Sequence, residues 1–131
     1  MANERENSTN YTIYENAALG DVRIADEVVA IIAGIAAMDV EGVVSMSGSS
    51  GSLQKEIISR FGNKVLSKGV RIRMEEGSVE AELSVILDYG CVIPDVTAAI
   101  QEKVKSAIET MTGLEVRAVN VHVADVRLEE E

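Results

Sequence analysis

Cys91 and His122 are the side chains of this sequence whose types suit nucleophilic catalysis, in which a base activates a thiolate. Cys91 lies just before a predicted helix that begins at Ile93, and a helix N-terminus is one setting that activates thiolates. His122 falls on the polar side of a predicted strand, opposite Val121 and Val123, and we interpret it as an exposed strand histidine. We therefore predict no catalytic residue and no enzymatic activity.

Two acidic residues and a glycine-containing stretch point superficially to other chemistry. Glu80 and Glu82 face arginines on a predicted strand, so solvated ion pairs account for them better than acid–base catalysis does. The stretch from Gly48 to Gly51 matches the GxxG spacing of KH RNA-binding domains, which need positive surroundings and a helix on either side. Here a predicted strand precedes it and the formal net charge is -10, so we interpret it as a linker and expect no nucleic-acid partner.

Metal and disulfide chemistry lack the residues that they need. One histidine and one cysteine cannot form a common zinc site, and a single cysteine excludes an intrachain disulfide. No cluster of histidines and carboxylates at ligand spacing stands out. We expect no metal and no cofactor, and the cysteine usage is typical of a reduced, cytoplasmic protein.

The stretch 78–126 predicts a strand, a helix and a strand in succession. Apolar side chains alternate from Val79 to Leu87, as in a strand that is buried on one face. From Pro94 the apolar residues recur every three or four positions, as on one face of a helix, until Thr112-Gly113 ends the pattern. The period then returns to two over Val119–Val123. Such a unit cannot bury its apolar side alone, so the rest of the chain must complete a sheet-and-helix core.

A β-hairpin with Glu76-Gly77 as its turn is predicted just before this helix. Its paired residue numbers sum to 153, and the charged pairs and apolar pairs then agree on one register. The apolar pairs are Val70 with Leu83, Ile72 with Ala81 and Met74 with Val79, and the charged pairs are Arg71 with Glu82 and Arg73 with Glu80.

A second helix is predicted from Ala25 to Met38, between short strands at Asp21–Ile24 and Val43–Met46. Its residues are apolar nearly all round, which indicates burial on more than one side. Either the sheet and the neighbouring helix cover it within one chain, or part of it, including Ile31 and Ile35, is a homo-oligomer interface.

The segment 53–68 combines an apolar stripe with basic side chains. Its charged residues give a local net charge of +3 inside an acidic chain, which suits an anionic membrane surface or an acidic partner. The alternative is that it caps the core with its lysines outward. We predict a short amphipathic helix here, with Lys55, Arg60, Phe61, Lys64 and Lys68 as the candidate interaction residues.

The 131 residues predict one domain over residues 19–127, with a disordered tail at 1–18 and an acidic tail at 128–131. Hydrophobic residues make up 47% of the chain but aromatic residues only 3%, so the core must be aliphatic. The longest apolar run, Val28–Met38, is well short of the ~20 residues that span a bilayer. No signal-peptide pattern opens the chain.

Taken together, these segments resemble the alkaline shock protein family of Gram-positive bacteria, whose members are linked to envelope stress. The resemblance covers about residues 19–127 and departs most over residues 48–66. The stretches that carry it are Gly20–Val29, Glu41–Val44, Lys68–Val70, Asp88–Gly90, Ile93, Val104-Lys105, Thr112–Val116 and Val119–Val121.

The family resemblance implies a small, cytoplasmic, non-enzymatic protein of cell-envelope homeostasis. It also implies self-association and attachment near the membrane through a membrane-anchored partner, while a peripheral contact with lipid stays open.

We predict an α+β, two-layer fold, with a mixed four- to five-stranded sheet and two main helices on one face. The predicted function is that of a scaffold or adaptor in envelope stress. The alternative is a small-molecule or lipid-binding accessory to a metabolic enzyme, with an aliphatic pocket between helices and sheet.

Overall fold

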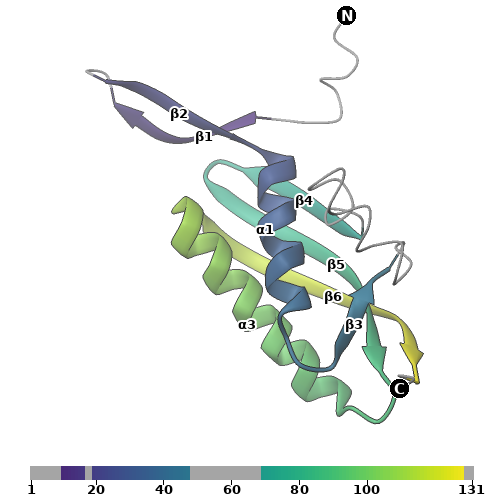
Figure 1. Ribbon diagram of the computed structural model, residues 1–131. Helices are drawn as coiled ribbons and strands as arrows, with labels where there is room; N and C mark the ends of the chain where they lie inside the picture. Colours follow the sequence, from purple (N-terminus) through teal and green to yellow (C-terminus); the bar gives the residue numbers. More distant parts are fainter. Residues whose placement is uncertain (1–9, 17–18, 48–68, 129–131) are drawn as a thin grey trace, which may run out of the picture.

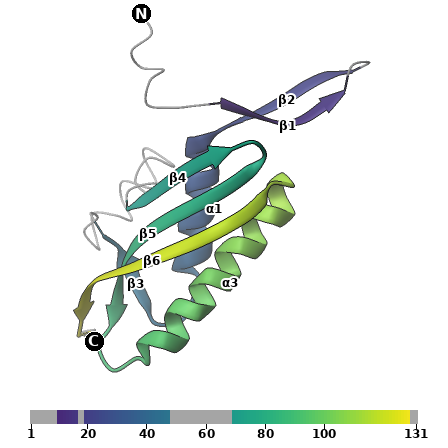
Figure 2. The ribbon, with the colours of Figure 1, turned by 180° about the vertical axis from the view of Figure 1, so that it is seen from behind.

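A computed structural model describes residues 10–16, 19–47 and 69–128, which form two sheets and two helices. The elements in chain order are β1 (Asn10–Asn16), β2 (Gly20–Ala25), α1 (Asp26–Met38), β3 (Val43–Met46), β4 (Val70–Glu75), β5 (Ser78–Asp88), α3 (Ile93–Thr112) and β6 (Glu115–Arg127). Both helices lie on one face of the four-stranded sheet (Figure 1), and the opposite face is seen from behind in Figure 2. The predicted α+β fold of two layers is confirmed.

Strand β5 is the centre of the four-stranded sheet. Along one edge it pairs in parallel with β6, and along the other it pairs antiparallel with β4 and then with β3. The parallel pair is connected through α3, as the strand–helix–strand pattern predicted. β6 pairs with β5 from Glu115 to Arg127, so the last strand of the predicted unit 78–126 begins before the alternation over 119–123 and extends beyond it at both ends.

The hairpin of β4 and β5 has the predicted register. Val70 pairs with Leu83 and Arg71 pairs with Glu82. In every remaining pair the two residue numbers also sum to 153. The charged pairs lie on the open face of the sheet, where Arg71 and Glu82 are exposed. Apolar alternation and charge pairing therefore specified this register correctly.

The core is aliphatic and lies between β5 and the two helices. The inward residues of β5, from Val79 to Leu87, are at most 1% exposed. Ile100 and Val104 of α3 and Val29 of α1 are completely buried against them. Every second residue of β5 and the residues on one face of each helix therefore point into the same apolar layer.

The residues just before and just after the segment 48–68 both hydrogen-bond to the same residue of β5. The Ser47 N–H donates to the Ser84 oxygen at 2.9 Å, and the Ser84 N–H donates to the Gly69 oxygen at 2.8 Å. A side chain at Gly69 would place its Cβ 2.8 Å from the Ser47 oxygen, and φ is +82°, so glycine allows the two ends to meet. The predicted amphipathic helix over 53–68 lies outside the described residues.

β1 and β2 form an antiparallel ribbon of their own, separate from the main sheet. It projects beyond the N-terminal end of α1 in both views (Figures 1 and 2). We expected residues 1–18 to be a disordered tail, and for residues 10–16 that expectation is wrong. The register of β1 against β2 shifts between Thr12 and Tyr14, so the side chains of β1 do not follow a strict period of two.

Candidate functional site

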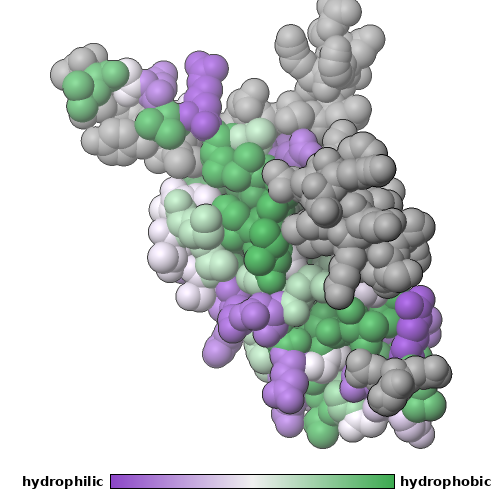
Figure 3. All heavy atoms as spheres, in the orientation of Figure 1, coloured by the Kyte–Doolittle hydropathy of each residue, from purple (hydrophilic) through white to green (hydrophobic). Residues whose placement is uncertain are grey.

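Helix α1 exposes an apolar stripe on the side that faces away from the sheet. Val28 is 43% exposed and Ile35 is 51% exposed, while Ile31 between them is half-buried. The spacing of three and four residues places all three on one side of the helix. Figure 3 shows hydrophobic atoms gathered along α1. The sheet and α3 bury the other side of α1, so the described residues cover part of this apolar helix and leave part of it exposed.

The stripe borders a groove between α1 and α3. Ile35, Ala36 and Met38 form one wall, and Lys103 and Ala107 of α3 form the other, around a hollow of about 360 Å³. An ion pair crosses the groove, with 2.9 Å between Lys103 Nζ and Asp39 Oδ2.

A second hollow, of about 600 Å³, continues along the outer side of α3. It is lined by Ala99, Glu102, Lys103, Ser106, Ala107, Thr110 and Met111. Met111 is 68% exposed, so apolar surface extends from α1 onto the last turn of α3. Both hollows are wide and open to solvent, which suits contact with a surface better than enclosure of a substrate.

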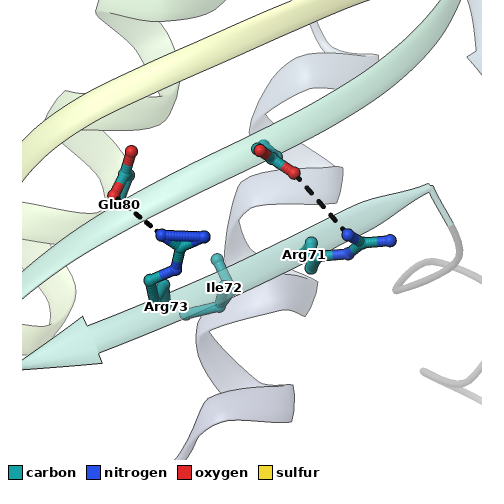
Figure 4. Close-up of a pocket in the computed structure, with 5 residues that line it drawn as sticks. Arg71, Ile72, Arg73 and Glu80 are labelled. Carbon is teal, nitrogen blue, oxygen red and sulfur yellow. Dashed lines mark ion pairs between the residues drawn. The ribbon is translucent and has the colours of Figure 1, made fainter.

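The open face of the sheet carries ion pairs. Arg71 lies 3.9 Å from Glu82 and Arg73 lies 3.7 Å from Glu80, measured between side-chain nitrogen and oxygen (Figure 4). Arg117 of β6 also reaches Glu80 at 3.5 Å. The hollow among these side chains is only about 60 Å³. Long, solvated pairs of this kind fix the strand register and contribute at most ~1 kcal/mol each.

Cys91 and His122 lie on opposite sides of the sheet. Cys91 is half-buried against the core in the turn before α3. His122 is exposed on β6, beside Ser84 of β5, and its neighbours Val121 and Val123 pack inward. The structure therefore does not bring this thiol and this imidazole together as a nucleophile and its base.

Two side chains of α3 cap the outer edge of β6. The Val116 N–H donates to Glu109 Oε2 at 3.0 Å, and Gln101 Nε2 donates to the Val119 oxygen at 2.9 Å. These bonds occupy backbone groups that an edge strand would otherwise offer to another chain. Sequence reasoning missed both residues, because a side-chain bond to a strand seven or eighteen positions away leaves no periodic signal.

The environment of Glu109 favours its charged form. The bond from the Val116 N–H and then the bond from Lys105 Nζ, at 3.0 Å, lower the pKa of the Glu109 carboxyl from its ordinary value of 4.5. The spacing of four between Lys105 and Glu109 was the one part of this arrangement visible in the sequence.

Within residues 10–16, 19–47 and 69–128, no helix is long and apolar enough to cross a membrane. The same residues contain no group of three or more histidine, cysteine or acidic side chains that could hold a metal ion. The predicted interaction residues Lys55, Arg60, Phe61, Lys64 and Lys68 lie outside the described residues. Ile31 and Ile35 are the predicted candidates that can be placed, and both lie on the apolar stripe of α1.

Comparison with known proteins identifies relatives over nearly the whole chain. The sequence model of the alkaline shock protein family, described by a cell envelope-related function, matches residues 14–128. The uncharacterized protein YqhY of Bacillus subtilis is 31% identical over 125 residues, which cover 95% of this chain and 90% of YqhY. The uncharacterized protein Spy1535 of Streptococcus pyogenes is 38% identical over 109 residues, covering 82% of this chain and 80% of the relative.

A relative with a functional name is more distant. A stress response regulator gls24 homolog of Streptococcus pyogenes is 25% identical over 117 residues, covering 88% of this chain and 64% of that protein. Among solved structures, a variant of the MamM CTD covers 76% of this chain and 94% of its own length, at 18% identity and a TM-score of 0.47. A likeness at that level carries no conclusion about function.

Proposed function

Because the chain belongs to the alkaline shock protein family, whose function is related to the cell envelope, we propose that it is a non-enzymatic scaffold or adaptor of the envelope stress response. The family match confirms the resemblance that the sequence segments carried. In this proposal the protein works in the cytoplasm near the membrane, through self-association and through contact with a membrane-anchored protein.

The observation that carries the proposal is the exposed apolar stripe of α1. Val28 and Ile35 expose aliphatic surface next to the open groove that α3 shares. A grouped, exposed apolar surface on a small domain is typical of a protein interaction site. The polar groups on the open sheet face are instead arranged as solvated ion pairs, which have no need of a partner.

The test compares a charged substitution on the stripe with one beside it. Ile35→Glu should abolish recovery of the protein with the membrane fraction after crosslinking in cells. Ala98→Glu adds the same charge to an exposed position of α3 outside the groove and should leave recovery unchanged. Equal recovery of wild type and Ile35→Glu would contradict a role for the stripe.

The basic segment 53–68 belongs to the same proposal as a peripheral membrane contact. Reversing the charges of Lys55, Arg60 and Lys64 to Glu should weaken co-sedimentation with anionic vesicles, because each basic residue near an anionic surface contributes about 1 kcal/mol. Sedimentation of both proteins to the same extent would limit the interaction surface to the folded domain.

A second candidate function rests on the groove between α1 and α3. Its hollow of about 360 Å³ combines apolar walls, which suit the chain of a fatty acid, with the ion pair of Lys103 and Asp39, in which the carboxylate of a fatty acid would have to replace Asp39. An accessory protein that binds a lipid or small molecule for a metabolic enzyme would be stabilised by its ligand. A rise in melting temperature with fatty acids that Lys103→Ala removes would favour this candidate over the scaffold.

A further inference from the structure

Among the described residues, the ribbon of β1 and β2 is the element least able to be stable without further contacts. It is a two-stranded sheet that pairs with no third strand of the described chain. Isolated two-stranded hairpins are marginally stable in water, and such a ribbon needs a third strand or a helix against its apolar face. The ribbon touches its own domain mainly where β2 enters α1, since Ile24 and Ala25 are half-buried and the residues from Gly20 to Arg23 are exposed.

One face of β2 is apolar and largely uncovered by the described chain. Val22 and Ile24 share this face by strand alternation, and Val22 is 49% exposed. The register places Tyr14 opposite Val22 and Tyr11 opposite Ile24. The other face of β2 carries Asp21 and Arg23, so β2 is amphipathic.

The same ribbon cannot cover the stripe of its own α1. β2 ends at Ala25 and α1 begins at Asp26, so no linker would let the ribbon fold back. Both views show it leading away from the helix (Figures 1 and 2). The apolar face of the ribbon and the α1 stripe are therefore two exposed surfaces that follow one another directly along the chain.

We propose that a second copy of this chain covers both surfaces, with each ribbon lying across the α1 stripe of its partner. A two-fold axis near the junction of β2 and α1 exchanges the two elements, and the contact is isologous. The proposal deepens the self-association in the proposed function and rests on it.

The lengths of the two elements agree with this exchange. Val22 lies ~10 Å from the base of the ribbon at Ala25, at the usual rise of a strand. Ile31 and Ile35 lie ~8 Å and ~14 Å from the start of α1, at the usual rise of a helix. Val22 of one copy thus falls between Ile31 and Ile35 of the other.

The charge distribution also favours a second copy as the occupant. The chain carries a net charge of -10, so two copies repel each other over most of their surface. Residues 28–38 contain no charged side chain, and the charged side chains of the ribbon are Glu15, Asp21 and Arg23. The α1 stripe therefore adds no carboxylate of its own to a contact with the ribbon.

The edge of β6 is a weaker site for self-association. Glu109 and Gln101 already bond to its outward backbone groups at Val116 and Val119. A strand from another copy would have to displace both side chains.

The test is disulfide trapping between two differently labelled chains, both with the native thiol removed by Cys91→Ser. Val22→Cys in one chain mixed with Ile35→Cys in the other should give a covalent heterodimer on mild oxidation. Arg23→Cys mixed with Ile35→Cys is the matched control, because Arg23 lies on the opposite face of the ribbon, and it should give at least tenfold less. Equal trapping by both pairs, or trapping by neither, would overturn the proposal.

Sedimentation velocity supplies a second readout. Val22→Ser should raise the dissociation constant of the dimer at least tenfold, and Arg23→Ser should change it less than twofold. A monomer at all concentrations, or a Val22→Ser effect seen only on binding to anionic vesicles, would overturn the proposal in favour of a different occupant. If the chain is a monomer but Ile35→Glu still abolishes membrane recovery, the exchange fails and the proposed adaptor function stands.

Discussion

α1 and α3 lie side by side on the same sheet, but the faces that they turn away from it carry different kinds of side chain. α3 buries Ile100 and Val104 and turns charged side chains such as Lys105 toward solvent. α1 also buries one side against the core but leaves Val28 and Ile35 exposed. A helix on a sheet needs only its inward face to be apolar. The fold therefore explains the sequence of α3 apart from Met111 in its last turn, whereas α1 carries several apolar residues that the described part of the fold leaves exposed.

The largest expected effect separates the inward face of α3 from the outward face of α1. Ile100→Ala should lower the free energy of unfolding by about 2–5 kcal/mol, because a completely buried isoleucine leaves a cavity. Ile35→Ala should cost less than about 1 kcal/mol, because half of that side chain is already in water. Urea denaturation of both variants measures the difference, and equal losses would show that the two helices are packed alike.

The turn after α1 tests how closely the two helices are joined. A Cβ at Gly42 would lie 2.9 Å from Val96 Cγ2 of α3, and φ there is +102°. Gly42→Ala should therefore cost about 1–3 kcal/mol from backbone strain and crowding. Gly90→Ala is the control, since φ is +99° but nothing lies within 4 Å of its Cβ. A loss at Gly42 no larger than at Gly90 would contradict tight packing of this turn on α3.

Acid titration tests the capping of β6 by α3. The lowered pKa of Glu109 means that its ionised form stabilises the fold above 4.5, its ordinary pKa, and that this stabilisation is lost as pH falls through the lower folded value. Wild type should exceed Glu109→Gln in unfolding free energy at pH 7, and the difference should shrink toward pH 3. Lys105→Met should remove the smaller part of the effect, because the Val116 N–H is the main cause. A difference independent of pH would contradict this assignment.

The smallest effect is expected at the ion pair between the helices. Lys103 and Asp39 are 2.9 Å apart, but their side chains are 49% and 70% exposed. A double-mutant cycle of Lys103→Ala and Asp39→Ala should give a coupling below about 1 kcal/mol that falls with salt. A larger coupling that salt does not change would mean that the pair, and not apolar packing, holds α1 against α3.

Local periodicity predicted the parts of the fold whose partners are near in sequence or strictly patterned. The alternation in β5, the hairpin register and the helical stripe of α3 were all read correctly, because each residue type follows from one buried face. The Pro94 start and the Gly113 end of α3 were also visible as local signals.

The rest depended on contacts that periodicity does not encode. β1 has an irregularity at Thr12 and pairs outside the main sheet, so its strand was missed. The apolar pattern of α1 runs nearly all round and gives no direction, so the exposure of Ile35 could not be read from the sequence. The capping bonds of Gln101 and Glu109 depend on where α3 lies over β6.

The central claim is that the outward face of α1 serves binding and not folding, and one experiment on Ile35→Glu measures both. Self-association is followed by analytical ultracentrifugation, and the free energy of unfolding is measured at concentrations where the protein is a monomer. We predict that the association constant of Ile35→Glu is at least tenfold lower than that of wild type. Its unfolding free energy should lie within about 0.5 kcal/mol of the wild-type value. Unchanged association, or a loss of stability comparable to that of Ile100→Ala, would contradict the claim.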